Sequence, residues 1–320
     1  MMVRLWGVRG SIPTPVSNED IERKLFVALR GAAGVDLADE AAVRSYVASL
    51  PVHVRGGWGG NTTCVEVRTA AGDVLIIDAG SGLRRLGESL LGGDFGRGQG
   101  HAVMLFTHTH WDHIQGWPFF GPLFIPGNRF DVYAGHDDIE DRLRYQMSPR
   151  FFPVPLEVMG ATKTFHHITG DLELFEGRMK VRPLTLDHPG DAYAFRIEAD
   201  GHSFVMATDG EYKELVGDYW RKYVDFYREA DVLVFDAQYT LREALVEKQN
   251  WGHSSAMIGI DLAADANVGT IVMVHHEPTY NDEKIKQIFD DAMRYLDRLP
   301  ANERPKVVVG YEGLTVRLDP

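Results

Sequence analysis

The chain has 320 residues, of which 44% are hydrophobic, and a formal net charge of −13 at pH 7. This length supports one large core, and we expect a single domain over residues 1–320, because no Ser/Gly/Pro-rich linker or internal repeat divides the chain. The negative charge disfavours a protein that holds long nucleic acid by neutralising phosphates; a small anionic substrate remains compatible, since bound metal ions can supply local positive charge.

The chain start has no apolar stretch typical of a signal peptide. No later stretch contains the roughly 18 consecutive apolar residues that a membrane-spanning helix needs. We therefore expect a cytoplasmic protein without a membrane partner. Cys64 is the only cysteine, which excludes a disulfide framework and a cysteine-based zinc site. We expect Cys64 to be a small buried hydrophobic residue rather than a reactive thiol.

Helical patterns dominate the segment at about 17–55. Residues 18–29 and 39–50 have helical periodicity and bracket the glycine-bearing stretch 31–34, which predicts an inserted helical hairpin. The hairpin could cover the mouth of a site, form the contact of a homodimer, or be a surface decoration.

Short β-branched runs recur along the rest of the chain, and helical patterns at 254–266 and 281–299 lie between or after them. Strands in this number with interleaved helices predict an α/β sandwich. The predicted strands cover residues 63–68, 74–77, 102–106, 129–133, 203–206, 232–235 and 270–274.

Several of these runs end on a residue that can bind a metal or a proton, and sites at strand ends are typical of α/β enzymes. These residues are Asp78, His108, Asp209, Asp236 and His275.

The densest cluster of such residues follows the run at 102–106, in Thr107-His108-Thr109-His110-Trp111-Asp112-His113. On an extended segment, alternate side chains share a face, so His108 and His110 can reach one ion. If a helix then begins, Asp112 and His113 turn toward a second ion. Imidazole and carboxylate ligands fit zinc, manganese or iron, and two ions can clamp the oxygens of a displacement reaction.

Further motifs follow in order: Ile76-Ile77-Asp78-Ala79-Gly80, Leu186-Asp187-His188-Pro189-Gly190, Val205-Met206-Ala207-Thr208-Asp209 and Val274-His275-His276-Glu277-Pro278. Together with the histidine motif, they resemble the metallo-β-lactamase superfamily, in the branch of ribonuclease Z and the PhnP-type cyclic phosphodiesterases. The resemblance covers most of the chain outside the helical hairpin. It implies an αββα sandwich of two mixed sheets flanked by helices.

The resemblance also implies two divalent metal ions, with zinc as the first expectation and manganese or iron as alternatives. Asp209 would bridge the ions, Asp78 would orient a ligand from outside, and His276 is an alternative to His275. The implied ligands are His108, His110 and His188 for one ion and Asp112, His113 and His275 for the other.

The segment Trp251-Gly252-His253-Ser254-Ser255 resembles the part of ribonuclease Z that protonates the leaving oxygen. This assigns His253 as general acid; the alternative is a histidine at a helix start beside an N-cap Ser254. Ribonuclease Z has a glutamate partner where this chain has Met206. Either Asp236 supports His253 instead, or the proton relay is weaker.

Aromatic residues could form an apolar wall for a base or ring, although core packing is an equally good explanation for each of them. They are Trp117, Phe119, Phe120, Phe124 and those within residues 145–155. A clear counterpart of the arm by which ribonuclease Z grips tRNA is absent from the sequence.

We therefore expect a metal-dependent hydrolase that cleaves small phosphodiesters, including cyclic ones, through a bridging hydroxide, with Asp112, Asp209 and His253 taking part in catalysis. One alternative is a carbonyl hydrolase such as a lactonase, thioesterase or β-lactamase-like enzyme. Flavin-linked di-iron chemistry is disfavoured by His110, where that branch has a carboxylate. The alternative of another class is a non-catalytic metal-binding interaction protein.

Overall fold

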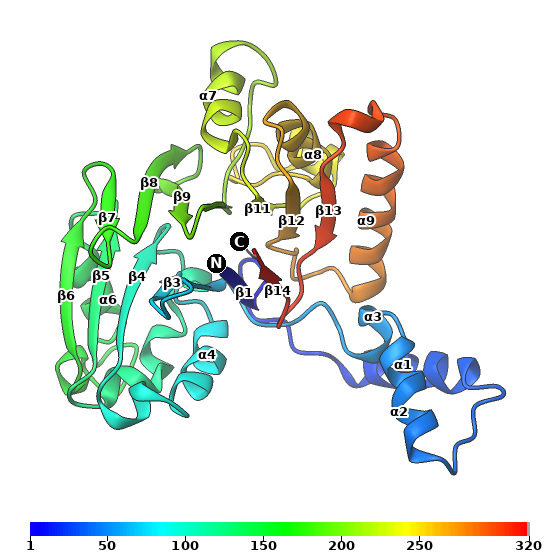
Figure 1. Cartoon of the computed structure of the whole chain (residues 1–320), viewed down its shortest axis with the longest axis horizontal. Helices are drawn as coiled ribbons and strands as arrows, with labels where there is room; N and C mark the ends of the chain where they lie inside the picture. Colours follow the sequence, from blue (N-terminus) through cyan, green and yellow to red (C-terminus); the bar gives the residue numbers. More distant parts are fainter. Residues whose placement is uncertain (319–320) are drawn as a thin grey trace.

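The computed structural model describes residues 1–318, in which two seven-stranded β-sheets lie face to face (Figure 1). The first sheet has the order β14-β1-β2-β3-β4-β5-β6 and the second the order β13-β12-β11-β10-β9-β8-β7. The first contains β1 (Met2–Gly7), β2 (Cys64–Arg68), β3 (Val74–Ile77), β4 (His101–Phe106), β5 (Arg129–Ala134), β6 (Thr162–His167) and β14 (Thr315–Arg317). The second contains β7 (Leu172–Leu174), β8 (Met179–Leu186), β9 (Ala192–Ala199), β10 (His202–Ala207), β11 (Val232–Asp236), β12 (Thr270–Val274) and β13 (Lys306–Val309).

The central strands are apolar on both faces. In β3, Leu75 and Ile77 point into the core between the sheets, whereas Ile76 points into the outer core beneath the helices. This follows from the alternation of side chains along a strand. Runs without polar alternation, such as 74–77, are typical of strands that are covered on both sides.

Helices cover the outer face of each sheet. Side chains of α4 (Gly82–Leu90) and α6 (Ile139–Gln146) pack in the core outside the first sheet, and those of α7 (Gly217–Tyr227), α8 (Ala256–Asp265) and α9 (Asp282–Leu296) pack outside the second. The result is a helix–sheet–sheet–helix sandwich (Figure 1), and the predicted αββα fold is confirmed.

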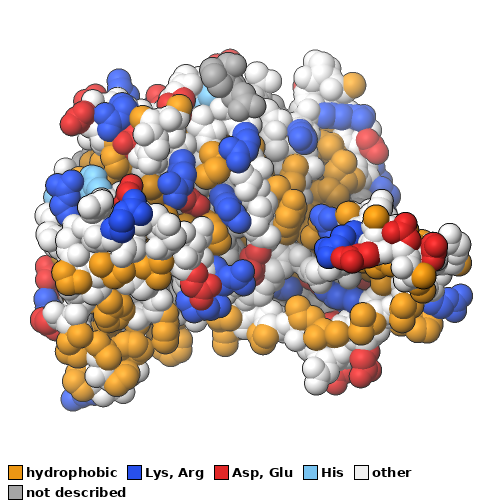
Figure 2. All heavy atoms as spheres, turned by 60° about the horizontal axis from the view of Figure 1, so that its bottom comes forward, with side chains coloured by type: hydrophobic (Ala, Val, Ile, Leu, Met, Phe, Trp, Pro, Cys, Tyr) orange, Lys and Arg blue, Asp and Glu red, His pale blue; other side chains and the backbone are white. Residues whose placement is uncertain are grey.

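The segment at 17–55 forms α1 (Asn18–Gly31), α2 (Glu40–Ser49) and the short α3 (Val52–Arg55), at one side of the sandwich (Figure 1). Ser17 and Asp39 cap the first two helices by accepting backbone N–H groups. No residue of α1 or α2 is buried, and hydrophobic side chains lie open on these helices (Figure 2). The homodimer and the division into one domain with an insertion remain predictions.

Several helix limits differ from the expected ones by one to three residues. The helix predicted from Ser254 begins at Ala256, and its N-cap is Ser255, whose side chain accepts the backbone N–H of Ile258. The helix predicted to Leu299 ends at Leu296, after its N-cap Asn281. Within residues 1–318, the structure contains no helix with the length and apolar character needed to cross a membrane.

Candidate metal centre

The candidate ligands come from loops that follow strands at one edge of the two sheets. Asp78 directly follows β3, His275 directly follows β12, and Asp209 lies two residues after the end of β10. All three have left-handed backbone conformations, with φ of 61° for Asp78, 59° for Asp209 and 63° for His275. Such conformations are costly for residues other than glycine, and they are concentrated at functional sites. These strained turns carry three of the residues that meet at the candidate site.

The first group contains His108, His110 and His188. His108 and His110 lie on the extended segment after β4, and His188 follows β8. One ligand atom from each residue lies within 4.8 Å of the others, and Nε2 of His188 is 3.0 Å from Nδ1 of His110. The structure therefore brings together the histidines that the sequence assigned to one ion.

The second group contains Asp112, His113 and His275, together with Asp209. Asp112 and His113 turn inward because the short helix α5 (Trp111–Ile114) begins directly after His110. Oδ2 of Asp112 is 3.1 Å from Nε2 of His275 and 3.4 Å from Nε2 of His113. All members of this group are buried.

Asp209 lies between the groups. Its Oδ1 is 3.2 Å from Nε2 of His113 and 3.3 Å from Nε2 of His275. Its Oδ2 is 3.7 Å from Nε2 of His108 and 3.9 Å from Nε2 of His188. Each oxygen thus faces one group, which is the placement that a bridging carboxylate needs.

The outer ring nitrogens have acceptors of their own. Nδ1 of His113 is 2.8 Å from Oδ2 of Asp78, and Nδ1 of His188 is 2.9 Å from the carbonyl oxygen of Gly252. Nδ1 of His275 is 2.8 Å from Oε1 of Gln238. When Nδ1 donates to such an acceptor, Nε2 of a neutral imidazole carries a lone pair toward the centre, as in known metal sites.

The electrostatics of the buried ligands also favour a bound cation at this site. Burial lowers the pKa of His108 well below its usual value, so its imidazole is neutral. Burial also opposes the charged form of His275, but the carboxylates of Asp209 and Asp112 outweigh it and raise the pKa of His275 to about 9. Two buried carboxylates thus attract positive charge to the second group, which protons or metal ions can provide.

The donor set passes a further test of fit. Nε2 of His108 is buried and has no hydrogen-bond partner, although an unpaired buried polar atom is costly. Converging imidazole nitrogens and carboxylate oxygens are ligands for zinc, manganese or iron. The residues present therefore fit divalent metal ions.

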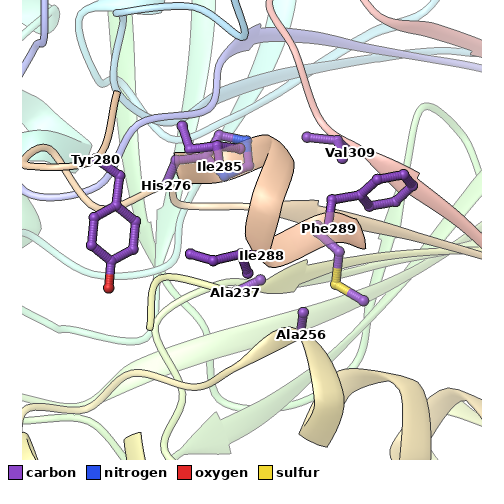
Figure 3. A pocket seen from close by; sticks show the side chains of 9 residues that line it. Ala237, Ala256, His276, Tyr280, Ile285, Ile288, Phe289 and Val309 are labelled. Carbon is purple, nitrogen blue, oxygen red and sulfur yellow. The ribbon is translucent and has the colours of Figure 1, made fainter. Parts of the chain in front are cut away.

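His276 lies outside these groups. Its Nε2 donates to the carbonyl oxygen of Gly310 at 2.9 Å, and its ring borders a small apolar pocket lined by Ile285, Phe289 and Val309 (Figure 3). Of the two neighbouring histidines, only His275 is placed to reach the candidate centre.

His253 has a carboxylate beside it, which comes from Asp236 and not from position 206. Nδ1 of His253 is 2.8 Å from Oδ2 of Asp236, which is fully buried, so Asp236 is the carboxylate that contacts this histidine. Asp187, which precedes the candidate ligand His188, forms an ion pair with Lys213 instead of joining the candidate ligands. The sequence interpretation missed Gln238; its place two residues after Asp236, at the end of a strand, was the available signal.

The predicted apolar wall is partly wrong. Trp117 and Phe120 are fully buried in the core beneath α4, because the turns after α5 fold them inward. In contrast, Trp111, Tyr145 and Phe151 are 82%, 60% and 63% exposed and line an open pocket of about 470 Å³.

The chain is similar to known proteins in sequence and in fold. A family model described as "Beta-lactamase superfamily domain" matches residues 74–276. Ribonuclease Z of Bradyrhizobium sp. (strain ORS 278) is 27% identical over 284 residues, which cover 74% of this chain and 89% of the relative. Ribonuclease Z of Oceanobacillus iheyensis is 23% identical over 246 residues, covering 60% and 76%. A solved diphosphatase of the PhnP family shares the fold, with a TM-score of 0.60 and 18% identity over 99% of this chain and 98% of that protein.

Proposed function

Because this chain belongs to the metallo-β-lactamase superfamily and has ribonuclease Z relatives, we propose that it is a dinuclear metal-dependent phosphodiesterase that acts on small phosphodiesters, including cyclic ones. That the chain is a hydrolase follows from the family and these relatives. The two-ion site, the metal and the substrate class are our inference. The placement of Asp209 between two groups of ligands is the observation that carries it.

Zinc is the first expectation for both ions. One ion would be held by His108, His110 and His188, and the other by Asp112, His113 and His275. Asp209 would contact both ions. When bound, the ions supply Lewis-acid charge for the non-bridging phosphate oxygens and lower the pKa of a coordinated water toward about 7. The chain's own contribution is to hold these ligands in place through Asp78, Gln238 and the carbonyl group of Gly252.

His253 is the proposed proton donor to the leaving oxygen. Its ring lies against the centre, with centroids 5.2 Å from His188 and 5.0 Å from His275. Nδ1–H donates to Asp236, so the proton on Nε2 is the one available to a departing alkoxide. The buried carboxylate also holds the imidazole ring in this orientation.

A small substrate is supported by the charge of the chain. Binding of a long polyanion depends on many Lys and Arg contacts, and a net charge of −13 opposes it. Small diesters need local positive charge only, which the metal centre provides.

The test is hydrolysis of bis(p-nitrophenyl) phosphate by protein loaded with zinc or with manganese. We expect turnover that Asp112→Ala abolishes, because this carboxylate belongs to the second group and also accepts the backbone N–H of Ser11. Glu88→Ala is a matched control, since Glu88 is an exposed acid on α4. Absence of turnover with both metal positions filled would refute the proposal and move attention to lactones and thioesters.

A further inference from the structure

The candidate metal centre opens to solvent on one side. Among its predicted ligands, His110 is exposed, whereas the others are buried. A substrate therefore reaches the centre past His110. The side chains next to His110 on the surface will contact the part of the substrate that does not react.

Trp111 follows His110 and is 82% exposed. It lines the pocket of about 470 Å³ together with Ile114, Tyr145 and Phe151, and we call this the aromatic pocket. The rings of Tyr145 and Phe151 meet edge to face, with centroids 5.3 Å apart. Thr109 and Trp111, which both line the pocket, flank the candidate ligand His110 in the sequence. Large exposed aromatic side chains mark a binding surface, and this volume fits a ring system.

Polar groups in the aromatic pocket favour a heteroaromatic ring over an alkyl chain. Gln146 donates from Nε2 to the carbonyl oxygen of Ile114, but its Oε1 is buried and has no partner. If the side chain turns so that Oε1 faces the pocket, a ring N–H or an exocyclic amine can satisfy this acceptor, whereas an alkyl chain leaves it unpaired. Arg142 also lines the pocket, donates to Thr109 and pairs with Asp138, which fixes its planar guanidinium at the pocket wall.

We propose that the aromatic pocket binds the base of a nucleotide whose phosphodiester reaches the metal centre. This rests on the proposed phosphodiesterase function and narrows its substrates to nucleotides, cyclic ones included. The base stacks on the exposed rings of Trp111 and Tyr145, and a base donor pairs with Gln146. Every base can stack on aromatic side chains. We therefore expect the pocket to distinguish strongly between ligands with and without a base, and only weakly between one base and another.

The test compares the binding of AMP and of ribose 5-phosphate to the zinc-loaded protein by isothermal titration calorimetry. Both ligands carry a phosphate, and only AMP carries a base. We expect AMP to bind at least about tenfold more tightly, and Tyr145→Ala and Phe151→Ala each to reduce this ratio by about fivefold or more. Phe26→Ala is the matched control, because Phe26 is 61% exposed on α1 and should leave the ratio unchanged.

Equal affinities for AMP and ribose 5-phosphate in the wild type would overturn the proposal, as would a ratio that neither pocket variant changes. Tighter binding of octyl phosphate, lost in the same variants, would also overturn it in favour of an alkyl chain. Hydrolysis of bis(p-nitrophenyl) phosphate without a preference for AMP would refute the pocket alone. A base preference without any diester hydrolysis would refute the proposed function and leave the pocket standing.

Discussion

Oδ2 of Asp236 accepts a hydrogen bond from Nδ1 of His253 at 2.8 Å and another from the backbone N–H of Asp209 at 3.1 Å. One buried carboxylate thus fixes both the proposed proton donor and the turn that carries the proposed bridging ligand. Met206, which stands where ribonuclease Z has a glutamate, packs instead in the core between the sheets.

This relationship predicts that Asp236→Asn impairs cleavage according to the leaving group. An amide in place of the carboxylate no longer holds the ring of His253 by a charge-assisted hydrogen bond, so delivery of its proton to the leaving oxygen is impaired. We expect kcat for a methyl phosphodiester to fall about 100-fold or more, and kcat for a p-nitrophenyl diester, whose leaving group needs little protonation, to fall much less. His253→Ala should show the same contrast in steady-state assays. Equal losses for both substrates, with metal content unchanged, would contradict this role.

A second prediction concerns Cys64, which is fully buried in β2. Burial raises the pKa of its thiol well above the usual value, with the nearby carboxylates of Glu66 and Asp78 adding to the effect. The thiolate is the reactive form, so native protein at pH 8 should not react with Ellman's reagent. Protein unfolded in guanidinium chloride should release one equivalent of thionitrobenzoate. Rapid reaction of the native protein would show that β2 opens readily.

The sequence was sufficient for features that depend on local pattern. Continuous apolar runs predicted the central strands, and the spacing of His108, His110, Asp112 and His113 predicted two groups, since it needs only an extended segment followed by a helix. Asp78 and Asp209 were identified because each ends such a run. These residues lie at strand ends, where a short range of sequence determines the direction of a side chain.

Features that depend on distant contacts could not be predicted. Gln238 meets His275 only because β11 and β12 pair in parallel register, and the choice between His275 and His276 depends on which face of β12 the next turn leaves open. Trp117 and Phe120 could not be separated from Trp111 and Phe151 by composition, because burial depends on how the turns after α5 fold against α4.

Alanine substitutions at the two neighbouring histidines, His275 and His276, should differ in their effect on metal content. His275→Ala removes a side chain that faces Asp112 and Asp209, and we expect a loss of about one bound ion per chain, measured by inductively coupled plasma mass spectrometry. His276→Ala should keep the metal content. It leaves the carbonyl group of Gly310 unpaired, so the free energy of unfolding should fall by about 1–3 kcal/mol. Loss of metal in His276→Ala alone would reverse the assignment.

The last prediction uses two glycines with similar backbone conformations. Gly252 has φ of +83°, and a Cβ atom there would lie 2.1 Å from Nδ1 of His188, the atom that its own carbonyl group holds. Gly201 has φ of +77°, and a Cβ atom there would meet nothing within 4 Å. Both alanine variants therefore carry the same backbone strain, about 1 kcal/mol, and only Gly252→Ala displaces a candidate ligand.

We expect Gly252→Ala to weaken zinc binding about 10- to 100-fold in competition with a chromophoric chelator, because the second contact of His188 is lost. Gly201→Ala should bind zinc as the wild type does, while its midpoint of urea unfolding falls slightly. Since the strain is common to both variants, the difference between them measures the contact at His188 itself. Equal zinc affinities would mean that His188 adjusts to the new methyl group, and that the loop carrying Trp251, Gly252 and His253 does not fix the metal ligand.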